Sequence, residues 1–235
     1  MIDVVPAGPF RVNTLVVHLE GPFVFIVDPA GSDFSGDNYK LSQFLEQQSL
    51  KVVLVLLTHG HFDHIGGLKK IAADFPEAPV LIHEKDSDFI GPDSEILQER
   101  SLKLMGFEEF LPYVSDLPAP DAFLSDGKSL WDCLASIKGK SFSSYGPGVK
   151  KALSLWQVMS TPGHSPGSVC LYNKEERTLI SGDTVFYKSY GRTDLPGGDE
   201  STIIKSLKKI YHNLPKETLV YPGHDYCGFM LQDNL

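Results

Sequence analysis

The sequence predicts a layered α/β domain. Short runs rich in β-branched and aromatic residues alternate with segments whose apolar residues recur at helical spacing, and this alternation occurs in both halves of the chain. Hydrophobic residues make up 42% of the 235 residues and charged residues 22%, as in globular proteins that bury a core. We therefore expect one domain over residues 1–235.

The chain is expected to begin with a β-hairpin. Residues 15–19 and 23–27 are β-rich and are separated by the turn residues Glu-Gly-Pro, and the second run ends at the loop that Asp28 begins. Residues 39–48 place their apolar side chains on one face, which predicts a short helix.

A strand–loop–helix unit follows. Residues 52–57 are continuously apolar, which predicts a strand buried on both faces. The loop 58–67 leads into an expected helix over 68–75, and residues 80–82 predict a further strand. Residues 86–106 are polar but show helical spacing.

The second half repeats the alternation after an irregular stretch. Residues 135–151 are rich in Ser, Gly and Lys, which predicts an insertion or flexible loop that could border the active site as a lid or lie at the surface without a role. Beyond it, we expect strands over 156–160, 168–172, 178–181 and 218–221, and an amphipathic helix over 201–214.

A cluster of metal-binding side chains lies directly after the expected strand 52–57. His59, His61, Asp63 and His64 occur within six positions of a loop that ends in two glycines. Imidazole and carboxylate are ligands that zinc prefers, and ends of strands are where α/β proteins commonly place such groups. In an extended stretch, alternation lets His59 and His61 point the same way.

Three later loops repeat this signal. His164, Asp183 and His224 each follow an expected strand, and each has a neighbouring glycine. Four strand-end loops that each carry a suitable ligand predict one metal centre. The other three histidines (His18, His83 and His212) lie in a strand, at a strand end and on a polar helix face, and we do not expect them to bind metal.

The spacing H-x-H-x-D-H over residues 59–64, with the distant His164, Asp183 and His224, resembles the metallo-β-lactamase superfamily. The resemblance implies a four-layer αββα sandwich whose two sheets share the active-site edge. It implies a first metal at His59, His61 and His164, a second at Asp63, His64 and His224, and Asp183 bridging both. It also implies that Asp28 is a buried aspartate supporting the ligand loop.

Within the superfamily the chain is most similar to the glyoxalase II branch, in its short bacterial form. Thr-His-Gly-His-Phe-Asp-His and the segment beginning Gly-Arg-Thr-Asp at position 191 carry this likeness. That branch binds glutathione with a Lys and a Tyr and with a C-terminal helical domain, for which this chain ends too early. Arg192 and Asp194 replace the Lys and the Tyr, so the identity of the thiol in the substrate stays open.

The predicted activity is hydrolysis of an acyl thioester. Two divalent metal ions can share a water and lower its pKa so that hydroxide attacks the carbonyl. Zinc is the first choice for these ions, and iron and manganese stay open as alternatives. Asp183 would bridge the ions and Asp63 would accept a proton. We expect Arg192, Lys188, Tyr190 and Tyr145 to contact the substrate.

Three alternatives remain open within the same resemblance. One is a mononuclear iron persulfide dioxygenase, which shares the Gly-Arg-Thr-Asp segment. Another is a lactonase, phosphodiesterase or nuclease, and the third is a scaffold without activity. Metal content, oxygen uptake and a panel of substrates separate them.

Composition excludes several other partners. The net charge is −9 and no run of Lys or Arg stands out, which argues against nucleic acid or an anionic membrane as partner. No apolar run approaches the roughly 20 residues that span a bilayer. Three scattered cysteines and no signal-peptide pattern indicate a cytoplasmic protein acting on a small molecule, while the oligomeric state stays open.

Overall fold

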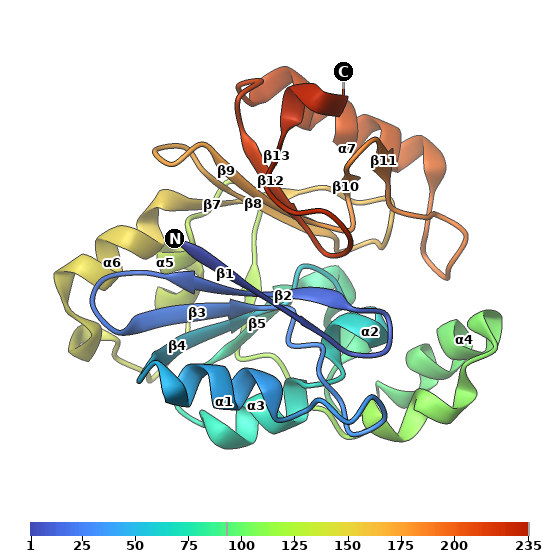
Figure 1. Ribbon diagram of the computed structural model, residues 1–235, viewed down its shortest axis with the longest axis horizontal. Coiled ribbons are helices and arrows are strands. Elements are labelled where there is room, and N and C mark those ends of the chain that lie inside the picture. The colour runs from blue at the N-terminus through green and yellow to red at the C-terminus, as the bar shows by residue number, and fades with distance from the viewer. Residues whose placement is uncertain (93, 235) are drawn as a thin grey trace.

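Two mixed β-sheets face each other, and helices cover their outer faces (Figure 1). The computed structural model describes residues 1–92 and 94–234. This arrangement is the four-layer αββα sandwich that the resemblance implied.

The first sheet has six strands in chain order. Its first three strands are antiparallel neighbours, and the next three are added in parallel. The hairpin expected over 15–19 and 23–27 is confirmed, with a longer first strand. The strands are β1 (Ile2–Ala7), β2 (Val12–His18), β3 (Phe23–Val27), β4 (Lys51–Leu56), β5 (Val80–His83) and β6 (Ala122–Leu124).

The second sheet has five strands and the order β13-β12-β9-β8-β7. All its neighbours are antiparallel except β12 and β9, which run parallel. A small two-stranded sheet of β10 (Val185–Phe186) and β11 (Ser189–Tyr190) lies beside it. The five strands are β7 (Trp156–Ser160), β8 (Val169–Asn173), β9 (Thr178–Gly182), β12 (Leu219–Pro222) and β13 (Phe229–Met230).

Side chains along the strands of the first sheet point alternately into two hydrophobic cores, one on each face of the sheet. In β3, Phe25 and Val27 belong to the core between the sheets, whereas Val24 and Ile26 face the outer helices. The ring of Phe25 packs edge-on against Trp156 of the second sheet, with 5.6 Å between their centroids. A strand with both faces buried reads as a continuous apolar run, which explains why β3 and β4 could be predicted.

Helices cover both outer faces. The first sheet packs against α1 (Lys40–Gln47) and α3 (Leu68–Asp74), and the second against α7 (Glu200–Asn213), as Figure 1 shows. The side chain of Asp199 accepts a hydrogen bond from the amide of Thr202 and so caps α7. Among the described residues, no helix is long and apolar enough to span a bilayer.

The remaining helices lie at the two ends of the sandwich (Figure 1). One end carries α2 (Phe62–Ile65) and α4 (Glu95–Met105), and the other α5 (Leu130–Ala135) and α6 (Gly146–Leu155). The short 3-10 helices are η1 (Glu84–Phe89), η2 (Glu108–Tyr113), η3 (Ser143–Tyr145) and η4 (Leu231–Asn234).

The prediction of a flexible loop over residues 135–151 is wrong for much of that segment. Residues 143–145 form η3, and residues 146–155 form α6. Val149 and Leu153 of α6 are buried in the core between the sheets. These two residues lie four positions apart on one helix face, so the helix closes that core at the end opposite α4.

Candidate metal centre

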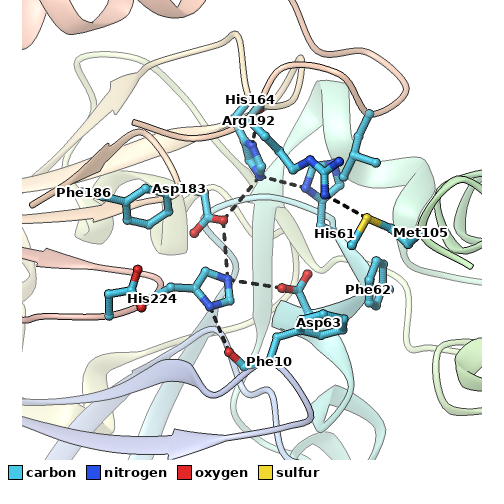
Figure 2. A pocket seen from close by; sticks show the side chains of 12 residues that line it. Phe10, His61, Phe62, Asp63, Met105, His164, Asp183, Phe186, Arg192 and His224 are labelled. Atoms are coloured by element: carbon cyan, nitrogen blue, oxygen red, sulfur yellow. Dashed lines mark hydrogen bonds and ion pairs between the residues drawn. The ribbon is translucent and has the colours of Figure 1, made fainter. Parts of the chain in front are cut away.

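Loops at the ends of strands from both sheets bring the seven predicted ligands to one place. The loop after β4 and the helix α2 carry His59, His61, Asp63 and His64. The loops after β7, β9 and β12 carry the other three. Figure 2 shows the imidazoles of His164 and His224 and the carboxylate of Asp183 directed at the same pocket as His61 and Asp63.

The first group of ligand atoms belongs to three buried imidazoles. His164 Nε2 lies 2.8 Å from His61 Nδ1 and 3.2 Å from His59 Nε2. The opposite nitrogens of two rings face fixed partners: His164 Nδ1 lies 2.8 Å from the carbonyl oxygen of Arg192, and His59 Nδ1 lies 3.0 Å from Thr58 Oγ1.

These partners determine which nitrogens carry protons. A carbonyl oxygen only accepts, so His164 Nδ1 carries the proton and its Nε2 presents a lone pair. The Thr58 hydroxyl donates to Asp28 Oδ2 over 2.7 Å, so it accepts from His59 Nδ1 and leaves His59 Nε2 bare. Two lone pairs that face each other at 3.2 Å repel unless a cation lies between them.

The second group consists of Asp63, His64 and His224. His224 Nε2 lies 3.2 Å from both Asp63 Oδ2 and His64 Nε2. The outer nitrogens again face acceptors, since His224 Nδ1 lies 3.2 Å from the carbonyl oxygen of Phe10 and His64 Nδ1 lies 2.9 Å from Asp28 Oδ2. When these two imidazoles are neutral, as metal binding requires, both inner nitrogens therefore present lone pairs toward Asp63.

The carboxylate of Asp183 lies between the two groups. Its Oδ1 is 3.3 Å from His64 Nε2, and its Oδ2 is 3.5 Å from His164 Nε2 and 3.6 Å from His224 Nε2. Asp183 Oδ1 is buried and has no hydrogen-bond partner within residues 1–92 and 94–234. A buried carboxylate oxygen without a donor is costly, and a cation would satisfy it.

Asp28 is buried behind the ligand loop. Its Oδ1 accepts from the amide of Thr58 over 2.7 Å, and its Oδ2 accepts from the Thr58 hydroxyl and from His64 Nδ1. Asp28 has a φ of 52°, a left-handed conformation that aspartate tolerates better than most residues. Although Asp28 also lies near His59, its oxygens already have three donors, so it orients ligands rather than binding metal.

Burial and charge separate the two groups electrostatically. Burial and neighbouring imidazoles lower the pKa of His61 to about 3 and lower that of His59 well below its usual value, so both are neutral. Burial opposes charge on His64 too, but the carboxylates of Asp183, Asp63 and Asp28 raise its pKa well above the usual value. Burial alone would raise the pKa of Asp183, yet the surrounding imidazoles lower it.

A pocket of about 330 Å³ opens beside these groups (Figure 2). Besides ligand residues, its lining is mostly apolar and includes Phe10, Phe62, Met105, Phe186 and Leu195. Such a lining with a few convergent polar groups is typical of small-molecule sites.

The sequence matches the family model of the metallo-beta-lactamase superfamily over residues 7–224. The chain belongs to the metallo-β-lactamase superfamily. Its seven predicted ligands lie within the matched region, and its His/Asp clusters can bind metal ions. It is accordingly a metallo-hydrolase of that superfamily.

Relatives and solved structures of similar length support the same assignment. The chain is 32% identical to the probable metallo-hydrolase YqgX of Bacillus subtilis (93% of this chain, 87% of that protein). It is 27% identical to the hydroxyacylglutathione hydrolase GloC of Haemophilus influenzae (95% and 90%). The crystal structure of the BLEG-1 B3 metallo-beta-lactamase superposes with a TM-score of 0.77 at 31% identity (99% and 95%). That of TTHA1623 in a di-iron-bound form gives 0.71 at 29% identity (98% and 95%).

Four residues are expected to contact the substrate, and of these the structure places only Arg192 at the pocket. Its guanidinium is paired with Asp194 through two contacts of 2.7 and 2.8 Å, and its Nη1 lies 2.9 Å from Met105 Sδ. Lys188 and Tyr190 instead line a separate cavity with Tyr211.

Tyr145 lies elsewhere as well. Its ring packs against Phe142 and Phe23, and its hydroxyl lies 3.5 Å from the carbonyl oxygen of Val53. It belongs to the helical end that closes the core between the sheets, so the prediction that it contacts substrate is corrected.

Sequence reasoning missed a second buried carboxylate. Asp86 of η1 is fully buried and accepts hydrogen bonds from both loops that carry His59, His61 and His164, the three-histidine group. It also missed Phe10 and Met105, which lie far from every ligand in the sequence. A single Asp in a polar stretch carries no local signal that distinguishes it from a surface residue.

Proposed function

We propose that the protein is a dinuclear thioesterase that hydrolyses an acyl thioester of the hydroxyacylglutathione type. The observation that carries this proposal is the convergence of seven lone-pair-bearing side chains beside an apolar pocket. The likeness to a hydroxyacylglutathione hydrolase over 95% of this chain supports the choice of substrate class.

In this proposal each ion has its own ligand group. His59, His61 and His164 would hold the first ion, and Asp63, His64 and His224 the second, with Asp183 as ligand to both. The inner nitrogens of His59 and His164 fit such a pair, and so does Asp183 Oδ1, which accepts no hydrogen bond from the part of the chain that the structure describes. Two divalent cations in these groups would supply Lewis acidity and a water that is acidic enough to act as nucleophile at neutral pH.

The chain's own side chains would hold the substrate and move the proton. Asp63 lines the pocket, and the imidazoles of His64 and His224 lower its pKa although burial opposes this, so the carboxylate is ionised and can accept a proton. Phe10, Phe62 and Met105 would exclude bulk water around the thioester. Arg192, at the rim, would contact the thiol part of the substrate.

Zinc is the first choice for both ions, and iron or manganese would suit the same ligands. The similar structure of TTHA1623 was determined in a di-iron-bound form, which keeps iron in the proposal. We further propose that residues 1–235 act as one catalytic unit, because ligands come from both halves. All three cysteines are unpaired, which supports a reducing, cytoplasmic location.

A second candidate is hydrolysis of a β-lactam. The observation that favours it is the likeness to the BLEG-1 B3 metallo-beta-lactamase, at 31% identity and a TM-score of 0.77. Both reactions attack a carbonyl carbon, and they differ in whether sulfur or nitrogen leaves.

The test compares metal content with a substrate panel. Protein as purified should contain about two equivalents of transition metal. It should cleave S-lactoylglutathione or a simpler thioester faster than a cephalosporin, a lactone, a phosphodiester or glutathione persulfide. His59→Ala and Asp183→Ala should lose metal and activity together. His212→Ala, on the exposed side of α7, is the matched control and should change neither. Full activity in Asp183→Ala would contradict the proposal.

A further inference from the structure

We propose that Asp86 is a positioning residue for the three-histidine metal site, and that it controls the affinity of this site and not that of the other. The inference rests on the proposed function, since it assumes that both ligand groups bind metal. Asp86 contacts no ligand side chain itself. It would act by fixing the backbone of the two loops that carry the three imidazoles.

The contacts of Asp86 reach both of these loops. Its Oδ2 accepts from the amide of Gly60, which lies between His59 and His61, over 3.0 Å. The same oxygen accepts from Ser165 Oγ over 2.6 Å, and Oδ1 accepts from the amide of Gly167 over 2.6 Å. Ser165 and Gly167 lie one and three positions after His164 in the same loop, so one carboxylate joins the two loops.

The surroundings of Asp86 fit a function beyond packing. The side chain is fully buried, and its donors are two amides and one hydroxyl, none of which carries a charge. Burial raises the pKa of Asp86, and the hydrogen bonds from Ser165, Gly60 and Gly167 act in the opposite direction. A buried carboxylate costs folding free energy compared with a neutral residue, and a nearby cation site offsets that cost.

Two glycines show how closely the loops approach η1. A Cβ on Gly167 would lie 2.6 Å from Asp86 Oδ1, and a Cβ on Gly60 would lie 2.3 Å from the Cβ of Phe89. Both distances are shorter than real Cβ contacts allow. The two loops therefore depend on η1 for their positions, and Asp86 is the residue that bonds to both.

The second metal group has a different support. Asp28 bonds directly to His64 and reaches His59 only through Thr58. Asp86 contacts the ligand loop at Gly60, between His59 and His61, and makes no hydrogen bond to the helix α2 that carries Asp63 and His64 or to the loop of His224. A change at Asp86 should therefore act on one ligand group selectively.

The test uses Asp86→Asn, which keeps the shape but replaces one acceptor oxygen by an amide donor. If the remaining oxygen accepts from Gly60 and Ser165, the new NH2 faces the amide of Gly167, and two donors meet at a 2.6 Å contact. We expect the affinity of the three-histidine site for zinc to fall about 10- to 100-fold, as for other residues that orient ligands. Competition with a chromogenic chelator measures the zinc affinity of both sites in the 235-residue protein.

Double variants identify the site that is lost. Under a zinc buffer that leaves the wild type with two equivalents, Asp86→Asn should retain one. Asp86→Asn combined with His61→Ala should still retain one, whereas combination with His224→Ala should retain none. Asp88→Asn is the matched control, because Asp88 is exposed on the same 3-10 helix, and it should retain two.

Each outcome of these measurements decides for or against the inference. Site-selective loss in Asp86→Asn supports the inference, while equal weakening of both sites, or two equivalents at wild-type affinity, overturns it. A wild type without metal would instead refute the proposed function. If Asp86→Asn does not fold, Ser165→Ala removes one of the three hydrogen bonds to Asp86, together with the contact of Ser165 Oγ to Ser168 Oγ, and should weaken the same site by a smaller factor. An unchanged three-histidine site in that variant also overturns the inference.

Discussion

The position of Asp183 between the two ligand groups depends on the absence of a side chain at residue 223. A Cβ built on Gly223 would lie 2.2 Å from Asp183 Oδ1 and 2.6 Å from His64 Cε1. The backbone of Gly223 cannot retreat, because its carbonyl accepts from the amide of Asn13 over 2.7 Å and its amide donates to Gly182 over 2.9 Å. In Gly223→Ala, the carboxylate and the imidazole must therefore move.

The size of the effect follows from that geometry. Ordinary contact begins at 3.4 Å, so relief of the 2.2 Å contact displaces Asp183 Oδ1 by about 1.2 Å. A displacement of about 1 Å at a reacting centre can lower the rate by about 100-fold. We expect kcat for thioester hydrolysis to fall by about that factor in Gly223→Ala, while overpacking lowers the free energy of unfolding by about 1–3 kcal/mol.

Steady-state kinetics with S-lactoylglutathione, metal analysis and urea unfolding of the same samples provide the assay. Gly21→Ala serves as control, since Gly21 has a φ of 62° with nothing within 4 Å of its Cβ position. That variant should lose about 1 kcal/mol of stability through backbone strain and keep its activity. Wild-type kcat with full metal content in Gly223→Ala would refute the reasoning.

Three other predictions concern pH, substrate charge and the core. Metal-free protein should be most stable near pH 6.5, the usual pKa of histidine. Burial lowers the pKa of His59 and His61, so their contribution to the free energy of unfolding is lost as pH falls below about 6.5. Carboxylates raise the pKa of His64 although burial opposes this, so its contribution is lost as pH rises above about 6.5. Thermal melts in chelator check this, and a melting temperature that rises steadily from about pH 5 to 8 would contradict it. Asp194→Asn should free Arg192 and lower KM for S-lactoylglutathione by no more than about fivefold, because exposed ion pairs contribute little. An equal change for an uncharged N-acetylcysteamine thioester would speak against this prediction. Phe25→Ala should lower the free energy of unfolding by about 3–5 kcal/mol in urea, and a loss below about 1 kcal/mol would show that the two sheets do not depend on this contact.

Elements with a local signal could be predicted from the sequence. The continuous apolar run of β4 reflects burial on both faces, and α7 has the helical spacing of a one-sided helix. The ligand loop could be found because four metal-binding residues occur within six positions, and the convergence of His164, Asp183 and His224 with them follows from their places at strand ends.

Features that depend on distant contacts could not be predicted in this way. Residues 146–155 form α6 because Val149 and Leu153 pack into the core between the sheets, which their Gly- and Lys-rich context does not indicate. The missed α5 did have a local signal, a capping box in which Ser129 and Asp132 bond reciprocally. The partners of Asp86 lie 26 to 81 residues away, and no pattern near position 86 points to them.

Neither half of this sandwich contains a complete ligand set. His59, His61, Asp63 and His64 follow the first sheet, whereas His164, Asp183 and His224 follow the second. Bound cations would consequently cross-link the two sheets and could be captured only after these have docked. Chelation should thus act on the docking itself: amide hydrogens at the seam between β2 and β12, where Asn13 bonds to Gly223, should exchange faster without metal than those inside either sheet.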